Sequence, residues 1–438
     1  MIIVRFLPAL ASCLLACSMM WTASPAKAQT RTVISGQLAT RTNDVMRLFQ
    51  GDEIEAEVFD ENFRNAVPIA QFRALTLQVV AQHGQPLEIL SIDPRNANSA
   101  KFRIRFEKSI GTVNIDLETN APHRIAGLLL TGFEAGGSSI DDVLAAIDAL
   151  PGRQGVLMQQ IDSTDQPPVA ALDPGGRYAI ASAFKLYILA ELDRAVQTGE
   201  RQWSDVVRLG PKSHPSGISQ NWPDDSPLTL HTLATLMISI SDNSATDTLV
   251  RIIGQERLAD IVKATGHQSP AELQPLLMTR QASALKMPVH AERRARFLAA
   301  GPEERENLLA EFDSALTLDS LDARMMTSKP NFIDQLEWFA TPQDMIRLLA
   351  YLNRNASPET LAILAINPGI GPDAAGKWRY LGYKGGSEPG VLSYNFLLRS
   401  GAGKSYALSV NWNNAEQSLQ ESELLALTTR LVSLLADQ

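Results

Sequence analysis

Between Asp52 and Gly84, apolar residues recur at the three-to-four-residue spacing of a helix. They are Ile54, Val58, Phe59, Phe63, Leu75, Val79 and Val80. Side chains at this spacing share one face of a helix, so the segment is predicted to be helical and amphipathic. Pro68 interrupts the pattern, and proline lacks the amide hydrogen that a helix interior needs. We therefore expect a pair of short helices.

After Pro86 the period changes to that of a strand. Apolar and polar residues alternate over 101–107 and again over 113–118, which predicts two half-buried antiparallel strands joined by a turn near 109–111. A third strand is expected over 123–132. Helices followed by a sheet make a unit of about a hundred residues, a size that can fold alone. The pattern resembles a nuclear-transport-factor-2-like cone, which implies a domain of that type over 29–135.

Small and polar residues over 134–139 indicate a flexible joint, and we place the domain boundary there. The second domain, 136–438, is expected to have helices over 182–197, 228–240, 341–353 and 419–435, and strands over 155–161, 380–384, 391–399 and 406–412. Because the early strand and the late strands come from distant parts of the chain, one sheet must collect them. The sequence thus predicts an α+β protein with helices packed on an antiparallel sheet.

Charge and histidine content narrow the classes of partner. The 39 basic and 48 acidic residues give a formal charge of -9, so there is no bulk electrostatic reason to bind nucleic acid or an anionic membrane. A small-molecule substrate is the expected partner. The six histidines show no metal-ligand spacing, so we expect no metal and no other cofactor.

Residues 1–28 have the features of an export signal. A weakly positive start at Arg5 precedes a mostly apolar run, and small residues up to Ala28 fit a cleavage site. An exported protein, periplasmic or secreted, is therefore expected. The alternative is a lipid anchor, because the residues before Cys17 resemble a bacterial lipoprotein cleavage box. Cys13 and Cys17 are the two cysteines of the sequence, so the chain after residue 28 has none for a disulfide, a zinc site or catalysis.

Two serine-containing motifs are candidates for chemistry. Ser182 and Lys185 lie three residues apart at the start of an apolar helix, so hydroxyl and amine share one face. A serine needs a neighbouring base to become a nucleophile, and a partly buried lysine is neutral enough to serve. Ser241 and Asn243 belong to a Ser-Asp-Asn run after a second apolar helix. Ser241 could relay a proton from Lys185 to a leaving group, while Asn243 fixes the geometry of the lysine or the substrate.

A third motif stands on a late strand. Lys384 is followed by Gly385, Gly386 and Ser387 at what we expect to be the strand's end. Glycine there lets a substrate approach closely, and Lys384 can bind a carboxylate. Each motif alone is common as a capped helix end or a turn. Their order, each in the expected structural context, is what gives them weight.

On these three motifs the chain resembles the penicillin-recognising serine hydrolases, and class A serine β-lactamases in particular, over roughly 150–438. With the front domain it resembles two-domain β-lactamase-like proteins such as the one encoded in the clavulanic-acid cluster. The resemblance implies that Ser182 is acylated, that Lys185 is its base and that Ser241 shuttles the proton. It also implies a substrate-carboxylate contact at Lys384, and an oxyanion hole made by the backbone N–H groups of Ser182 and Ser387.

The sequence departs from that family in two places. Gly385 stands where a threonine or serine is usual, so a substrate-binding hydroxyl is lost and Ser387 is the candidate to replace it. No Glu-x-x-Leu-Asn lies between Asn243 and Thr341, although class A enzymes use that glutamate to activate the deacylating water. Glu337 stands near the expected place, but its context favours a solvated helix residue.

Two functions follow. The first is an acyl-enzyme-forming hydrolase of β-lactams or related amides and esters, including an esterase or peptidase with poor β-lactam turnover. The second is a binding module that is acylated slowly. The complete set of Ser182, Lys185, Ser241 and Lys384 favours the enzyme, because a binding protein needs no proton relay.

Overall fold

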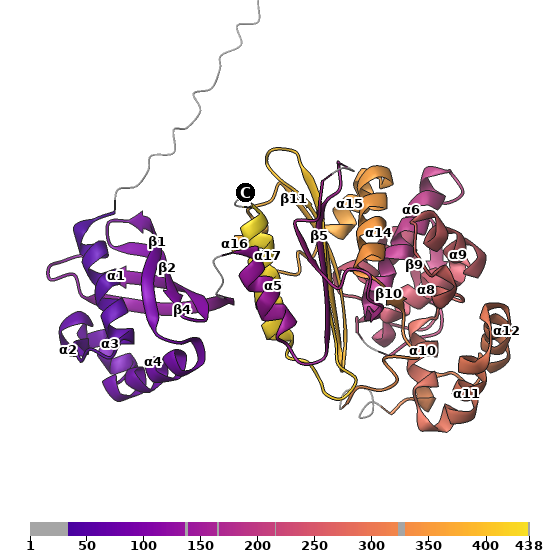
Figure 1. The fold of residues 1–438 in the computed structure, drawn as a ribbon, viewed down its shortest axis with the longest axis horizontal. Coiled ribbons are helices and arrows are strands. Elements are labelled where there is room, and N and C mark those ends of the chain that lie inside the picture. Colours follow the sequence, from indigo (N-terminus) through magenta and orange to yellow (C-terminus); the bar gives the residue numbers. More distant parts are fainter. Residues whose placement is uncertain (1–33, 136–138, 164–165, 215, 323–328, 437–438) are drawn as a thin grey trace, which may run out of the picture.

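The computed structural model describes residues 34–135, 139–163, 166–214, 216–322 and 329–436. Figure 1 shows two units, a smaller one with its own sheet and a larger one in which helices cover both faces of a second sheet. The ion pair between Lys101 and Asp373 links the two units, and the last helix lies against the last strand of the smaller one.

In the smaller unit, four helices lead into an antiparallel sheet whose strand order follows the sequence. The helices are α1 (Gly36–Phe49), α2 (Glu55–Val58), α3 (Glu61–Ala66) and α4 (Ile69–His83). The strands are β1 (Pro86–Asn96), β2 (Ser99–Phe106), β3 (Ser109–Leu117) and β4 (Ile125–Ala135). Their shared core includes Leu38, Val45, Phe59, Phe102 and Ile115.

The smaller unit differs from the sequence prediction in its helices, in one turn and in one strand. Helix α1 was not expected, and α2, α3 and α4 form where a pair of helices was expected. The turn expected near 109–111 falls instead at Glu107 and Lys108, because Ile110 is buried in register within β3. Strand β1 was not expected. It is an edge strand, exposed or half-buried along most of its length, so its residues show little alternation of apolar and polar types.

The larger unit is built on a five-stranded antiparallel sheet of order β11-β12-β13-β5-β6. These strands are β5 (Arg153–Gln160), β6 (Ala170–Leu172), β11 (Tyr380–Glu388), β12 (Val391–Arg399) and β13 (Ser405–Asn413). One face is covered by α5 (Ile140–Asp148) and α17 (Glu421–Ala436), with the short α16 (Pro372–Ala375) beside them (Figure 1). Because both faces are covered, β12 is buried at all but its last residue, and its sequence is apolar except at Ser393, Asn395 and Arg399.

The other face of the sheet carries a helical region with its own large core. Its helices are α6 (Lys185–Gln197), α7 (Leu230–Ser239), α8 (Asn243–Ile253), α9 (Gln255–Ala264), α10 (Thr279–Leu285), α11 (Ala291–Ala299), α12 (Pro302–Phe312), α14 (Pro342–Asn355) and α15 (Pro358–Leu364). Two small antiparallel pairs complete the unit, β7 (Tyr178–Ala179) with β10 (Phe339–Ala340) and β8 (Val206–Arg208) with β9 (Pro227–Thr229). None of the described helices has both the length and the apolar character needed to span a membrane.

Candidate active site

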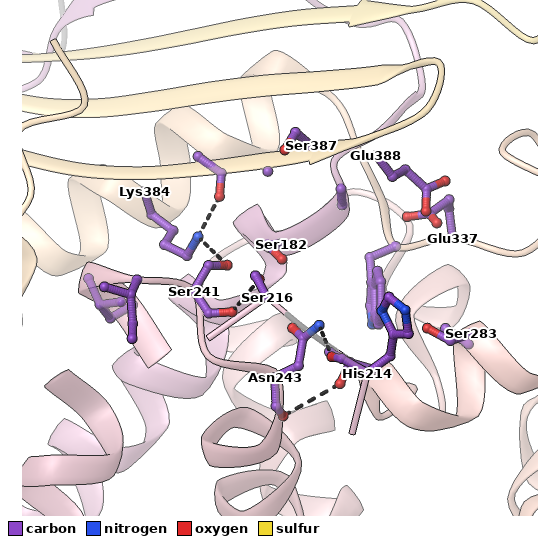
Figure 2. A pocket seen from close by; sticks show the side chains of 18 of the residues that line it. Ser182, His214, Ser216, Ser241, Asn243, Ser283, Glu337, Lys384, Ser387 and Glu388 are labelled. Carbon is purple, nitrogen blue, oxygen red and sulfur yellow. Dashed lines mark hydrogen bonds between the residues drawn. The ribbon is translucent and has the colours of Figure 1, made fainter. Parts of the chain in front are cut away.

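A cavity of about 470 Å³ lies where edge strand β11 meets the helical region. The structure brings eight of the residues singled out from the sequence to its wall. They are Ser182, Ser241, Asn243, Glu337, Lys384, Gly385, Gly386 and Ser387. Lys185 lies behind the wall, fully buried. Figure 2 shows Lys384 and Ser241 on one side of Ser182, with Glu337 and Glu388 on the other.

Ser182 lies in the 3-10 turn Ala181–Phe184, directly before α6 begins at Lys185. Ala181 has a φ of 42°, a left-handed conformation that is strained for a residue with a Cβ and that occurs mainly at functional sites. The turn is fixed from outside by Trp338, whose carbonyl accepts from the Ile180 amide at 2.9 Å. The Trp338 ring stacks on Phe184 with centroids 4.0 Å apart. The strained turn therefore has backbone and side-chain support.

The amine of Lys185 is held by the second motif. Its Nζ donates to the Ser241 carbonyl at 2.7 Å, to Ser241 Oγ at 3.1 Å and to Asn243 Oδ1 at 2.7 Å. Burial, and then the nearby charge of Lys384, place the Lys185 pKa well below its usual value. In its neutral form the amine has two hydrogens to share among these three acceptors, and its lone pair can accept a proton from Ser182, one helical turn away. A hydrogen bond between the Ser182 hydroxyl and the Lys185 amine is absent among the described residues, as is common before a substrate binds.

Ser241 connects the two lysines of the site. Its hydroxyl accepts from Lys185 and, at 3.0 Å, from Lys384 (Figure 2). Ser241 has a φ of 58° in the short connection between α7 and α8. Asp242 supports this connection, because its carboxylate caps α8 at the Ala245 amide and accepts from the Ser219 amide. Within the Ser-Asp-Asn run, Ser241 and Asn243 therefore contact Lys185, and Asp242 stabilises the backbone of the connection between α7 and α8.

Lys384 is also buried, and burial lowers its pKa to about 7. The expectation that its motif ends a strand was wrong, since β11 continues to Glu388, which pairs with Val391 of β12. Gly386 is needed at its position. A Cβ there would lie 2.1 Å from the Ile180 carbonyl oxygen and 2.7 Å from the Ser182 amide nitrogen, so only glycine lets β11 approach the Ser182 turn this closely.

Sequence reasoning missed the hydroxyl of Tyr383, which lies beside the space that a side chain at Gly385 would fill. A Cβ on Gly385 would lie 2.0 Å from the hydroxyl oxygen of Tyr383, and Tyr383 lines the same cavity. The hydroxyl next to the vacated side-chain position is thus that of Tyr383, two residues earlier on the same face of β11. Burial and then the charge of Glu421 raise the Tyr383 pKa above its usual value, so the group is a neutral donor.

Two further charged residues of the cavity wall, Lys286 and Glu388, were missed, and they form a cluster with Glu337. Lys286, at the end of α10, bonds Glu337 Oε1 at 2.5 Å and Glu388 Oε1 at 2.8 Å. The interpretation of Glu337 as a solvated helix residue was wrong. It lies outside any helix, just before β10, with its side chain 1% exposed. No local pattern could have found this cluster, because its members are 51 and 102 residues apart.

The charges of this cluster shift the pKa values of Glu337 and Lys286. Burial and then the carboxylate of Glu388 raise the Glu337 pKa to about 8, although Lys286 opposes the shift. Burial alone would lower the Lys286 pKa, but the two carboxylates outweigh it and raise that pKa. Oxygen Oε2 of Glu337 is buried without a hydrogen-bond partner. Within the described ranges, no three side chains of metal-ligating type gather in one place.

A sequence model of the family described as "Beta-lactamase enzyme family" matches residues 138–432. Among solved structures, a beta-lactamase from Sphaerobacter thermophilus is 22% identical, with coverage of 68% of this chain and 94% of that one and a TM-score of 0.46. PBP-A is 16% identical, with coverage of 68% and 95% and a TM-score of 0.46. An ancestral class A beta-lactamase is 15% identical, with coverage of 68% and 99% and a TM-score of 0.48. No curated protein sequence matches the chain.

Proposed function

The chain belongs to the beta-lactamase enzyme family, and from this premise we propose that it is an exported serine hydrolase acylated at Ser182 by β-lactams or related amides and esters. The observation that carries the proposal is the buried Lys185 amine, whose pKa is far below that of an ordinary lysine. It lies one helical turn from Ser182 and within hydrogen-bond distance of Ser241. A surface or purely structural lysine has no need of such a site.

Each of these groups has a defined step in the proposed acylation. Neutral Lys185 removes the proton of Ser182 as its oxygen attacks the substrate carbonyl carbon, and the carbonyl π electrons move to oxygen. The backbone N–H groups of Ser182 and Ser387 receive that oxyanion. The tetrahedral intermediate then collapses and breaks the bond to the leaving group. Ser241 gives its proton to the leaving group and recovers one from Lys185.

Lys384 has two proposed tasks on the leaving-group side. It donates to Ser241 and so orients the shuttle hydroxyl. With a substrate bound it contacts the leaving group's carboxylate, beside the hydroxyl of Tyr383. A pKa near 7 means that an incoming carboxylate would favour the protonated amine and so strengthen its own binding.

The remaining proposals concern where the protein is located and which fold its front domain has. Residues 1–28 would direct the protein out of the cytoplasm, to where β-lactams and cell-wall amides occur, and would then be removed, or the chain would be lipidated at Cys17. The nuclear-transport-factor-2-like assignment of the front domain is supported by four helices that lead into a four-stranded antiparallel sheet, an arrangement that many folds share.

A second candidate is a binding module, or an esterase or peptidase, with poor β-lactam turnover. One observation favours it: the described residues contain no Glu-x-x-Leu-Asn, and the carboxylate of Glu337 is engaged by Lys286. An esterase or peptidase of this kind would release its β-lactam acyl group slowly, whereas a binding module would already be acylated slowly. In both candidates Ser182 is the residue that is acylated, and they differ in how fast water hydrolyses the acyl-enzyme.

Labelling with a fluorescent penicillin tests the proposal. The wild type should become covalently labelled at Ser182, as located by mass spectrometry, and Ser182→Ala should not. Ser283→Ala is the matched control, since Ser283 lines the same cavity, and it should label normally. Label on another residue, or undiminished label in Ser182→Ala, contradicts the assignment. Loss of label during a chase with unlabelled penicillin distinguishes a hydrolase from a slowly released binding module.

A further inference from the structure

Three exposed isoleucines border the end of the cavity that carries Ser241. In the described part of the larger unit five large apolar side chains are exposed, and three of these, Ile218, Ile240 and Ile366, form what we call the apolar rim. Ile240 itself lines the cavity, although its side chain is 42% exposed. A single exposed apolar residue is ordinary, but several beside one cavity are typical of a ligand-binding groove.

Two members of the apolar rim belong to the connection between α7 and α8 or are bonded to it. Ile240 directly precedes Ser241 in this connection. The backbone amide of Ile218 donates to Asp242 Oδ2 at 2.8 Å. The rim is therefore fixed to the segment that places the Ser241 hydroxyl beside the two lysines.

Ile366, the third member, lies in the segment that follows α15. Its neighbour Asn367 lines the cavity and donates through its side-chain amide to the Ser239 carbonyl at 2.9 Å. The same segment packs on the ring of Tyr383, since a Cβ on Gly369 would lie 2.4 Å from two carbons of that ring. Ile366 is thus held between the end of α7 and strand β11.

We propose that the apolar rim is a subsite for an alkyl or aryl part of the substrate's leaving group. The inference rests on the proposed function, in which Ser241 gives its proton to the leaving group. That group therefore departs on the Ser241 side of Ser182 (Figure 2). An apolar group there removes its own surface and that of the isoleucines from water, which favours binding. The substrates are then esters or amides of apolar alcohols or amines.

The apolar rim and Lys384 recognise different parts of a leaving group. Lys384 bonds the Ser241 hydroxyl from β11, whereas the rim residues lie on the segments around 218, 240 and 366. A leaving group can place an apolar part on the rim and, where it has one, a carboxylate at Lys384. Neutral esters therefore test the rim without involving the carboxylate contact.

Two esters of phenylacetic acid test the subsite, one of 4-methylphenol and one of 4-butylphenol. The two phenols have nearly the same acidity, so the esters differ in three CH₂ groups of the leaving group and little else. A CH₂ group that is half buried on an open rim contributes about twofold. The wild-type second-order rate constant for acylation should therefore be about eightfold higher for the butyl ester. Equal constants, or a faster methyl ester, would overturn the proposal.

Serine variants of the rim locate the effect. The butyl-to-methyl ratio should fall to about half in Ile240→Ser and in Ile366→Ser, and further in the double variant. Val206→Ser is the matched control and should keep the ratio, because Val206 is 63% exposed in β8 and does not line the cavity. An unchanged ratio in the double variant, or an equal fall in Val206→Ser, refutes the subsite.

A second pair of esters moves the same three CH₂ groups to the acyl part. These are the acetate and the pentanoate of 4-methylphenol, and the ratio of their rate constants should be the same in the wild type and in Ile240→Ser/Ile366→Ser. A fall in this ratio as large as that for the leaving-group pair would overturn the proposal, because the rim would then not distinguish the two parts of the substrate.

Sedimentation of the wild type tests the other occupant of an apolar surface, a second copy of this chain. A dimer that Ile240→Ser/Ile366→Ser dissociates, together with acylation that is independent of the leaving group's chain length, would overturn the proposal. The same sedimentation coefficient in the wild type and the double variant, with the expected dependence on chain length, supports it.

Binding to Ser182→Ala separates this proposal from the proposed function. The variant cannot be acylated at residue 182, so calorimetric titration with the two phenylacetic esters reports recognition alone. Tighter binding of the butyl ester that is lost when Ile240→Ser is added supports the subsite even if the wild type is never acylated, a result that would refute only the proposed function. Acylation of wild-type Ser182 by both esters at equal rates and with equal binding refutes only the subsite.

Discussion

Replacing Lys286 with methionine should destabilise the larger unit by about 3 kcal/mol at pH 7. Lys286 and Glu337 have side chains that are 5% and 1% exposed, so their ion pair is cut off from water. Removing one partner of a buried pair typically costs about 3–5 kcal/mol, because the other charge is left without compensation. The lower end applies here for two reasons. Glu388 can turn toward water, and Glu337 is already prone to hold a proton.

The cost should also grow with pH. The folded pKa of Glu337, about 8, lies above the ordinary value of 4.5, so the folded protein binds a proton that the unfolded chain has released. The wild-type stability from this group is therefore lost as pH rises from about 4.5 to 8. Without Lys286 the Glu337 pKa rises further, which extends this loss to more alkaline pH. The difference between variant and wild type should be larger at pH 9 than at pH 6.

Urea unfolding followed by tryptophan fluorescence measures this loss. Every tryptophan after Trp21 lies between Trp203 and Trp412, so the signal reports on the larger unit alone. Lys404→Met is the control, because Lys404 is exposed on a turn and its loss should change stability little. The double variant Lys286→Met/Glu337→Gln should recover part of the loss. A loss below about 1 kcal/mol at both pH values, or a double variant no better than the single one, would refute this account of the cluster.

Other outcomes can be measured on the same protein. Lys185→Ala should slow acylation by roughly 10²–10⁴-fold in stopped-flow assays, the loss typical of a general base. In the wild type, the acylation rate should rise with pH and level off well below 10.5, since the Lys185 pKa is lowered; a rise centred at 10.5 would contradict this. Lys384→Ala should affect carboxylate-bearing substrates more than neutral esters, and equal losses count against the contact. Gly386→Ala should abolish rapid acylation while Gly401→Ala, with open space around it, leaves it intact; equal rates would show that β11 need not touch the Ser182 turn. Pre-steady-state traces with good acylating β-lactams should show a burst equal to the enzyme concentration and then a slower rate, whereas rapid turnover without a burst would show that deacylation has an effective base.

The local parts of this site were accessible from the sequence, and the nonlocal parts were not. Ser182 with Lys185, and Ser241 with Asn243, are short motifs at helix ends, where spacing alone fixes which side chains meet. The role of Tyr383 depends on the close packing of one strand, where its hydroxyl occupies the space beside Gly385. Spacing cannot report such a contact.

The cluster of Lys286, Glu337 and Glu388 shows the same limit more strongly. Charged residues are almost never fully buried unless paired, so a single glutamate in a polar segment reads as solvated. Its burial becomes predictable only when the partner is known, and the partners are distant in sequence. The edge strand β1 and helix α1 were missed for a related reason. The exposed positions of β1 and the buried Thr42 and Asp44 of α1 blur the contrast on which periodicity depends.

The sheet order has a consequence for biogenesis. Strand β5 pairs with β13, so Met158 lies opposite Leu408, and the Ser182 turn is closed by β11, which also comes late in the chain. A nascent chain that has emerged only as far as α12 contains Ser182 but lacks β11, the strand against which the Ser182 turn packs. Contacts so far apart in sequence form slowly, after most of the chain is available. The Ser182 turn is therefore expected to form late in folding, and if the chain is exported in extended form, as proposed, this turn would be complete only after the last strands had followed.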